Sequence, residues 1–202
     1  MKIAVFASGR GSNFQAILDS IKEGTCDAEV RVLITNKPDA QAIERAKANN
    51  IPVEVVDRKQ FASREELDDR IKELLDKYGA ELVVLAGYVL LLKGKKLLEA
   101  YKNRIINIHP ALLPAFPGVD AQKQAFDHGV KISGITIHFV DENLDAGPII
   151  YQEAVDISDC GSAEEAAAKI LEAEHEAYPK VVDMFAKGTV TVEGRRVVYK
   201  RN

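Results

Sequence analysis

The chain has 202 residues, 47% of them apolar and 29% charged, a composition typical of a globular domain and unlike that of a disordered, collagen-like or disulfide-scaffold chain. Twenty-seven Lys and Arg against 31 Asp and Glu give a net charge of −4, which argues against a general nucleic-acid-binding surface. Since Cys26 and Cys160 are the only cysteines and no signal peptide or membrane-spanning run is recognisable, we expect a cytoplasmic protein.

The first hundred residues alternate short apolar runs with helical periodicity. Strands are predicted at residues 2–6, 30–34, 53–56 and 82–86, and helices around 14–21, at 41–49 and behind the capping box Ser63-x-x-Glu66. Four β units in series predict an α/β fold with a doubly wound, mostly parallel sheet and helices on both faces.

The second hundred residues contain fewer helical patterns. A short helix is predicted at 95–101, and strands at 104–109, 132–140 and 149–155, where the last two flank a turn-rich segment. The final helix starts at the capping box Ser162-x-x-Glu165 and is predicted to break or kink at Pro179. A hairpin at 190–199 would then complete a single domain, residues 1–202, made of halves 1–100 and 101–202.

The segment Ser8–Asn13 joins the first strand to the first helix. Glycines allow close backbone approach, and a helix N-terminus favours an anion, so Gly11, Ser12 and Asn13 are candidates for holding a phosphate. Ser12 could instead only cap the helix with Gln15. Neither the third glycine of a dinucleotide fingerprint nor a P-loop lysine is present, which favours a mononucleotide-like ligand.

A second group of polar residues ends the strand at 104–109. The two-residue period of a strand places Asn107 and His109 on the same side, where their N–H donors could stabilise an oxyanion. Asp145 would favour the charged imidazole if the fold brings it beside His109. The alternatives are a core histidine bonded to a backbone carbonyl and an aspartate in an Asx turn.

Two other kinds of chemistry are disfavoured. His109, His138 and Asp145 could form a two-histidine, one-carboxylate metal site, but no closely spaced histidine pair occurs, and we expect no metal. No serine or cysteine stands in a recognisable nucleophile motif.

The segment Asn107–Pro114, together with Asp145–Ile150 downstream, resembles the folate-dependent formyltransferases. Gly9–Asn13 and Glu174-His175-x-x-Tyr178-Pro179 extend the resemblance over essentially the whole chain. It implies a Rossmann-like fold and transfer of the formyl group of 10-formyltetrahydrofolate to the amine of 5′-phosphoribosylglycinamide. The products would be N-formylglycinamide ribonucleotide and tetrahydrofolate, in purine biosynthesis.

The resemblance also implies roles for individual residues. Asn107 and protonated His109 would stabilise the oxyanion, and Asp145 would assist through a water that moves the amine proton to N10 of folate. Gly11, Ser12 and Asn13 would hold the 5′-phosphate and Glu174 the ribose. The residues implied for binding the folate are Arg64, Val89, Leu90, Leu91, Leu92, Asp141 and Leu144.

Several alternatives stay open at this point. Formyltetrahydrofolate hydrolases and other folate-dependent formyltransferases share the Asn-x-His…Asp pattern, although we expect 202 residues to leave no room for an added RNA-binding or regulatory domain. A non-catalytic nucleotide- or folate-binding module is the remaining class. We expect small molecules as partners, with no nucleic acid and no membrane, and a homodimer as one candidate assembly.

Overall fold

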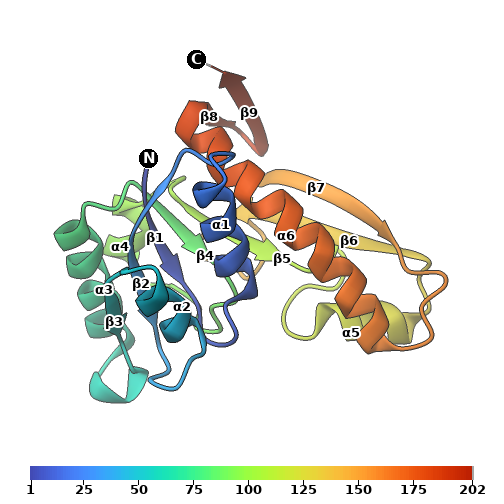
Figure 1. The fold of residues 1–202 in the computed structure, drawn as a ribbon, viewed down its shortest axis with the longest axis horizontal. Helices are drawn as coiled ribbons and strands as arrows, with labels where there is room; N and C mark the ends of the chain where they lie inside the picture. The colour runs from blue at the N-terminus through green and yellow to red at the C-terminus, as the bar shows by residue number, and fades with distance from the viewer. Residues whose placement is uncertain (202) are drawn as a thin grey trace. The chain divides into compact units, whose positions relative to one another are not determined.

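The computed structural model describes residues 1–201, which form two compact units, Met1–Ile106 and a second that begins at Asn107 (Figure 1). The first unit holds β1 (Lys2–Phe6), α1 (Ser12–Lys22), β2 (Glu29–Thr35), α2 (Ala42–Ala48), β3 (Val53–Val55), the 3-10 helix η1 (Arg58–Gln60), α3 (Arg64–Tyr78), β4 (Leu82–Leu85) and α4 (Lys95–Ala100). β5 (Ile105–His109) crosses the boundary, and the second unit holds α5 (Ala121–His128), β6 (Ile132–Phe139), β7 (Ile149–Asp156), α6 (Ala163–Lys187), β8 (Gly188–Glu193) and β9 (Arg196–Arg201). Every predicted strand is present within two residues of its expected bounds.

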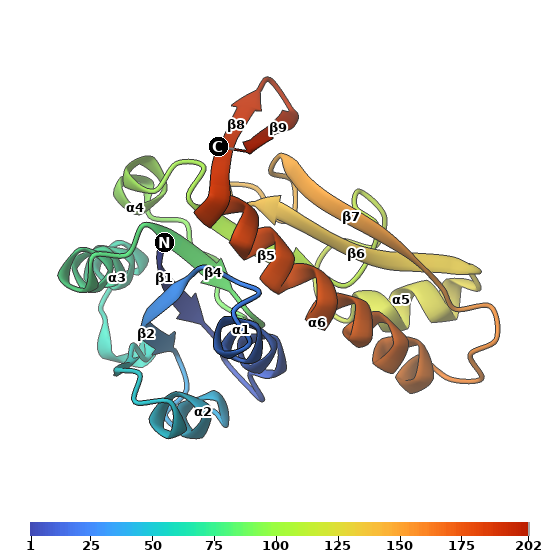
Figure 2. The ribbon, with the colours of Figure 1, turned by 45° about the horizontal axis from the view of Figure 1, so that its top comes forward.

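The first unit is built on four parallel strands. β1 pairs with both β2 and β4, and β2 pairs with β3, so the order is β3-β2-β1-β4. α1 and α2 cover one face and α3 and α4 the other (Figures 1 and 2). Ile3–Phe6 and Leu82–Leu85 are buried throughout, as strands covered on both faces require. The chain reverses its winding between β1 and β4, and their carboxyl ends form the topological switch point at which α/β sheets bind ligands.

In the second unit, β6 and β7 form a long antiparallel pair. β8 and β9 form the predicted hairpin, and β9 is also paired in parallel with β7. α6 runs along β6 and β7 (Figure 2). Gly188 is the C-cap of this helix.

Both predicted serine caps are confirmed at the helix starts, whereas the glutamates of the two boxes accept from the residue before the cap, Ala62 N and Gly161 N. The Ser63 hydroxyl accepts a hydrogen bond from the backbone N–H of Glu66, and the Ser162 hydroxyl accepts one from Glu165, each at 3.1 Å. A cap of this kind depends only on residues three apart, so the sequence shows it directly.

One helix prediction, the break at Pro179, is wrong, the alternative of a Ser12 cap is not met, and α5 and the short 3-10 helix η1 were not predicted. Gly11, not Ser12, is the N-cap of α1, and the Gln15 amide bonds to Asp19 instead of completing a capping box. α6 continues through Pro179 without a break because buried residues on both sides of the proline, including Tyr178 and Val182, hold the helix against the core. α5 begins at Asp120 in a left-handed backbone conformation without a side-chain cap, so the sequence shows no capping pattern that would predict this helix.

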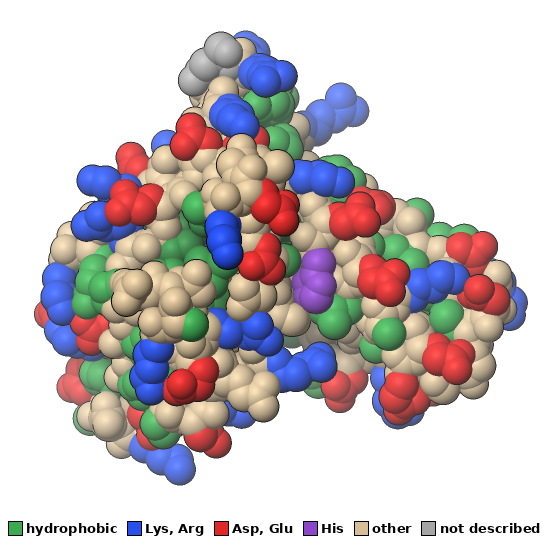
Figure 3. All heavy atoms as spheres, in the orientation of Figure 1, with side chains coloured by type: hydrophobic (Ala, Val, Ile, Leu, Met, Phe, Trp, Pro, Cys, Tyr) green, Lys and Arg blue, Asp and Glu red, His purple; other side chains and the backbone are tan. Residues whose placement is uncertain are grey.

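On the face drawn in Figure 3, basic and acidic side chains are interspersed rather than separated into patches of one sign. Within residues 1–201, no helix combines the length and the apolar character that a membrane crossing needs.

Candidate active site

The second unit brings His109 and Asp145 together. His109 is the last residue of β5, and Asp145 lies in the loop between β6 and β7. The His109 Nδ1 atom is 3.5 Å from Asp145 Oδ2, and the two side chains are only 4% and 10% exposed. A carboxylate at this distance in a largely buried setting fixes the direction of the imidazole ring.

The loop around Asp145 is shaped by close backbone contacts. The backbone N–H of Gly118 donates to Asp145 Oδ2 at 2.8 Å, and Asp145 itself has a φ of 49°, in the left-handed region. A Cβ atom on Gly147 would lie 1.8 Å from the carbonyl oxygen of Phe139, so only glycine fits there. The Gly118 N–H therefore holds the Asp145 carboxylate, and the close approach of Gly147 to Phe139 shapes the loop that carries it. A sequence pattern reveals neither contact.

Asn107 contacts a second histidine, His138 on β6. Its Nδ2 atom is 3.2 Å from His138 Nε2, while His138 Nδ1 is 2.9 Å from the Phe139 carbonyl. Since a carbonyl only accepts, Nδ1 carries the hydrogen, and Nε2 of the neutral ring accepts from the Asn107 amide. Burial lowers the pKa of His138, against the opposing effects of the Phe139 carbonyl and of Asp145, whose Oδ1 is 3.7 Å from Nε2. His138 therefore orients the Asn107 amide.

Both alternatives weighed for His109 and Asp145 can be compared with these contacts. His109 Nε2 donates to the carbonyl of Phe116 at 2.8 Å, so this histidine is bonded to a backbone carbonyl and also faces a carboxylate. The Asx turn in the β6–β7 loop is made by Asp141, whose Oδ1 accepts from Asn143 N at 2.8 Å. Asp145 instead turns its carboxylate to His109, His138 and Gly118.

In the first unit, the glycine-rich segment before α1 is braced by α2. Gly11 has a φ of 66°, and a Cβ atom there would lie 2.7 Å from the Ala42 Cβ. Arg45 on α2 donates from Nε to the Arg10 carbonyl at 2.8 Å and from Nη1 to Gln15 Oε1 at 2.9 Å. The N-cap residue of α1, Gly11, makes no side-chain capping hydrogen bond within the described residues. The positive end of the helix dipole and the Arg45 guanidinium therefore both lie beside this segment.

Ser8 links the carboxyl ends of β1, β2 and β4. Its backbone N–H donates to the Gly87 carbonyl and its hydroxyl accepts from Val89 N, both at 3.0 Å, while the hydroxyl donates to Asn36 Oδ1. The segments that follow β1 and β4 are thereby joined at the switch point.

The remaining predicted site residues occupy defined places in the two units. Arg64 is the first residue of α3, and Val89–Leu92 follow β4, with Val89 and Leu91 66% and 43% exposed and Leu92 buried. Asp141 and Leu144 lie in the β6–β7 loop, and Glu174 is buried on α6. Among the described residues, no group of three or more His, Cys, Asp or Glu side chains could hold a metal ion.

Comparison with known proteins decides the family. Residues 1–182 match the family model described as formyl transferase. The chain therefore belongs to the formyl transferase family. The interpretation of the sequence as a folate-dependent formyltransferase with a Rossmann-like fold is confirmed.

Individual members of the formyl transferase family are similar over nearly the whole chain. A phosphoribosylglycinamide formyltransferase of Bacillus subtilis is 48% identical over 90% of this chain and 92% of its own length. The crystal structure of glycinamide ribonucleotide transformylase 1 from Symbiobacterium toebii has a TM-score of 0.95 at 45% identity, covering 98% of this chain and 93% of that one. A trifunctional purine biosynthetic protein of Homo sapiens is 36% identical over 94% of this chain but only 19% of its own length.

Sequence reasoning missed several residues that shape these sites. Ser8 lies inside the glycine-rich segment without being singled out, and His138 was weighed as a metal ligand and given no role beside Asn107. Arg45 and the buried Asp68 carry no local motif. Only contacts between distant parts of the chain reveal them.

Proposed function

We propose that the protein transfers the formyl group of 10-formyltetrahydrofolate to the amine of 5′-phosphoribosylglycinamide, in purine biosynthesis. The observation that carries this proposal is the arrangement of Asn107, His138, Asp145 and His109 within one unit. The similarity to phosphoribosylglycinamide formyltransferases of Bacillus subtilis and Haemophilus influenzae supports the choice of acceptor.

The proposed mechanism is direct attack without a covalent enzyme intermediate. The neutral amine forms a bond to the formyl carbon, and the carbonyl electrons move to oxygen, where the Asn107 amide and the charged His109 ring donate hydrogen bonds. Because His138 Nε2 accepts one Asn107 hydrogen, the other amide hydrogen is available to the oxyanion. Such donors act on charge that develops only in the transition state.

Proton movement completes the reaction. Asp145 would position a water that takes the proton released by the attacking amine and delivers it to N10 as the bond between carbon and N10 breaks. His109 Nε2 already donates to the Phe116 carbonyl, and the developing oxyanion would share or replace that acceptor. The Asp145 carboxylate beside Nδ1 would keep the ring in its orientation through this step.

Binding roles follow the same proposal. Gly11, Ser12 and Asn13 would hold the 5′-phosphate at the start of α1, and Glu174 would contact the ribose. The folate would be bound by Arg64, Val89–Leu92, Asp141 and Leu144. The exposed apolar side chains of Val89, Leu91 and Leu144 offer surface for a pterin or an aromatic ring.

Incubation of the protein with 10-formyltetrahydrofolate, with and without 5′-phosphoribosylglycinamide, tests the proposed function. We expect tetrahydrofolate to form only when the acceptor is present. Formate release without acceptor would instead indicate a hydrolase, and no reaction with either mixture would indicate a binding module.

Location and assembly belong to the same proposal. We assign the protein to the cytoplasm because Cys26 and Cys160 are both free thiols in the structure. Light scattering of the purified protein distinguishes a monomer from a homodimer.

A further inference from the structure

The segment Tyr88–Gly94, between β4 and α4, is attached mainly at its two ends. At the start, Val89 N donates to the Ser8 hydroxyl at 3.0 Å. At the end, Lys93 N donates to Asp68 Oδ2 at 3.1 Å, and Gly94 N donates to the same oxygen. Within the described chain, no hydrogen bond involves the backbone of residues 90–92. The backbone of this segment is therefore held by hydrogen bonds only at its two ends, with the buried Leu92 side chain as a further attachment.

Asp68 is an unusual carboxylate for its position on α3. Its side chain is only 1% exposed, while that of its neighbour Asp69 is 41% exposed and paired with Lys96. Burying a carboxylate is costly unless donors compensate it. Here Oδ2 accepts from two backbone N–H groups and from Arg64 Nε at 3.4 Å. The helix thus carries a buried charge whose donors are the end of the segment and Arg64.

Gly94 allows the chain to approach this carboxylate closely. A Cβ atom on Gly94 would lie 2.4 Å from the Asp68 Cβ and 2.9 Å from Oδ2. Any larger residue would push the end of the segment away from α3.

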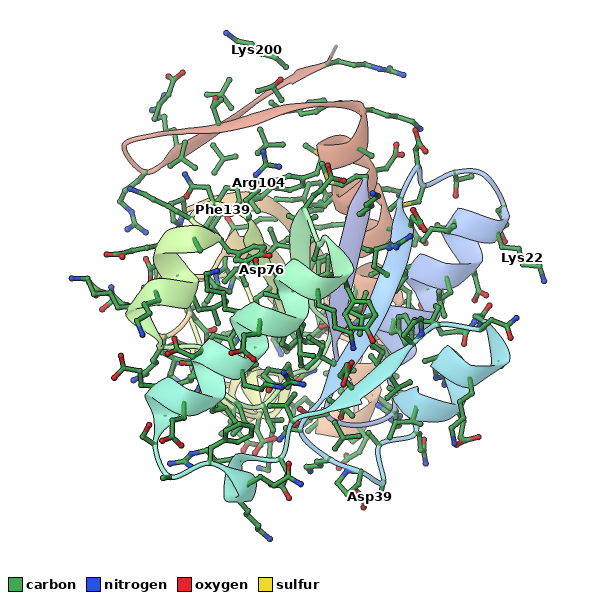
Figure 4. The ribbon with its side chains drawn as sticks, turned by 90° about the vertical axis from the view of Figure 1, so that its left-hand side faces the viewer. Lys22, Asp39, Asp76, Arg104, Phe139 and Lys200 are labelled. Atoms are coloured by element: carbon green, nitrogen blue, oxygen red, sulfur yellow. The ribbon has the colours of Figure 1, made fainter. Side chains whose placement is uncertain are left out.

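Helices α3 and α4 lie side by side, with Asp76 further along α3 (Figure 4). The Asp76 carboxylate accepts a hydrogen bond from the Tyr101 hydroxyl at 3.3 Å.

Three polar atoms around this anchor have no partner within the described residues. Arg64 Nη2, Asp68 Oδ1 and the Tyr88 hydroxyl are buried and make no hydrogen bond. The Tyr88 ring packs edge-on against Phe6, with ring centres 5.1 Å apart, and burial raises the pKa of its hydroxyl. Buried polar groups are normally satisfied by protein, water or ligand. Buried hydrogen-bonding groups without a partner therefore lie at both ends of the Tyr88–Gly94 segment: the Tyr88 hydroxyl at its start, and Arg64 Nη2 and Asp68 Oδ1 beside its end.

We propose that Asp68 is a positioning residue for the formyl donor: by holding Lys93 N, Gly94 N and Arg64, it fixes the Val89–Leu92 segment and the Arg64 guanidinium for the folate. This inference rests on the proposed assignment of those residues to folate binding. Asp68 itself does not touch the reacting atoms.

The test measures folate binding apart from turnover. Calorimetric titration with tetrahydrofolate gives a dissociation constant for wild type, Asp68→Asn and Asp68→Ala, and steady-state kinetics give KM for each substrate. Asp68→Ala removes charge-assisted hydrogen bonds, so we expect the dissociation constant and the donor KM to rise about tenfold. Asp68→Asn keeps an acceptor oxygen and should cause a smaller rise. The KM for the acceptor should change less than about twofold, because substitutions at distant, independent sites rarely affect one another by more than that.

Matched variants separate positioning from a general loss of structure. Asp69→Asn removes the neighbouring exposed carboxylate on α3 and should leave tetrahydrofolate affinity unchanged. Gly94→Ala displaces the same anchor from the other side and should weaken folate binding, and the double variant Asp68→Ala/Gly94→Ala should be less than additive. If Asp68→Ala does not fold, Asp68→Asn and Gly94→Ala provide the same comparison.

The outcomes distinguish the two proposals. Unchanged tetrahydrofolate affinity in folded Asp68 and Gly94 variants overturns the positioning role, as does an equal rise in both KM values. Absence of acceptor-dependent turnover in the wild type overturns the proposed function, whereas the binding titration still decides whether Asp68 shapes a folate site.

Discussion

His109 Nδ1 faces Asp145 Oδ2 at 3.5 Å, and the same oxygen accepts from the Gly118 backbone N–H at 2.8 Å. On its other side, His109 Nε2 donates to the Phe116 carbonyl. Both ring nitrogens thus face oxygen acceptors, which suits a ring that donates from both positions.

Removing either of the two side chains that we propose as oxyanion donors should lower turnover with little effect on binding. For Asn107→Ala and His109→Ala, we expect kcat to fall about 10²–10³-fold, because each donor acts on charge that develops in the transition state. KM for both substrates should stay within a few-fold, and steady-state kinetics measure the two effects separately. Ser12→Ala is the comparison, and it should chiefly raise the KM for the acceptor. If all three variants lost ground-state affinity equally, this division of roles would be refuted.

Asp145→Asn should reduce catalysis while keeping the shape of the side chain. We expect kcat to fall about 10²–10⁴-fold, the usual size of general acid–base assistance. The pH–rate profile should also change shape, because the negative charge beside His109 is lost. Asp156→Asn, which replaces an exposed carboxylate bonded to Ser158 N, should behave as wild type. An unchanged pH–rate profile in Asp145→Asn would remove this residue from the tuning of His109.

Gly11→Ala should destabilise the protein and weaken acceptor binding. Its φ of 66° and the 2.7 Å approach to Ala42 Cβ add strain and overlap. We expect the free energy of unfolding to fall by roughly 1–3 kcal/mol. Urea denaturation measures this, and the KM for the phosphorylated acceptor should rise. At Gly9 a Cβ atom meets nothing within 4 Å, so Gly9→Ala should leave the unfolding free energy nearly unchanged. Equal losses in both variants would contradict the argument from backbone strain.

His138 should make stability depend on pH. Burial lowers its pKa below the ordinary value of 6.5, so the unfolded chain binds a proton more readily than the folded one. Its contribution is therefore fully present above pH 6.5 and is lost as the pH falls through that value towards the folded pKa. The free energy of unfolding is measured by urea denaturation between pH 7.5 and 5, a range that brackets the ordinary histidine pKa of about 6.5. Over this range the wild type should lose more unfolding free energy than His138→Gln.

The control for this prediction is His128→Gln, which replaces an exposed ring. It should keep the pH dependence of the wild type. A His138→Gln variant with the same dependence as wild type would show that the buried ring is not its source.

Much of the fold follows from local patterns. The caps at Ser63 and Ser162, the buried runs of β1 and β4 and the alternation that pairs Asn107 with His109 each depend on residues a few positions apart. The alternation of strand and helix predicts a parallel sheet, and right-handed connections limit the possible strand orders, but the order itself was not predicted.

Where the predictions failed, distant packing was responsible. Pro179 is a helix breaker by local rules, yet α6 continues through it because its neighbours are buried in the core. α1 starts at a glycine turn at Gly11 and not at a Ser12 side-chain cap, and Ala42 leaves no room for a Cβ atom on Gly11. Gly11 and Ala42 are far apart in the sequence, so no local pattern links them.

The sequence by itself determined the strands, most helices, the formyltransferase pattern and the identity of Asn107, His109 and Asp145 as candidates. The tertiary structure alone decided that Asp145 reaches His109, that His138 orients the Asn107 amide and that Asp68 anchors the end of a loop 25 residues away. The physical reason is range: caps and strand periodicity act over a few residues, whereas the direction of a buried polar side chain is set by the distant backbone groups that satisfy its hydrogen bonds.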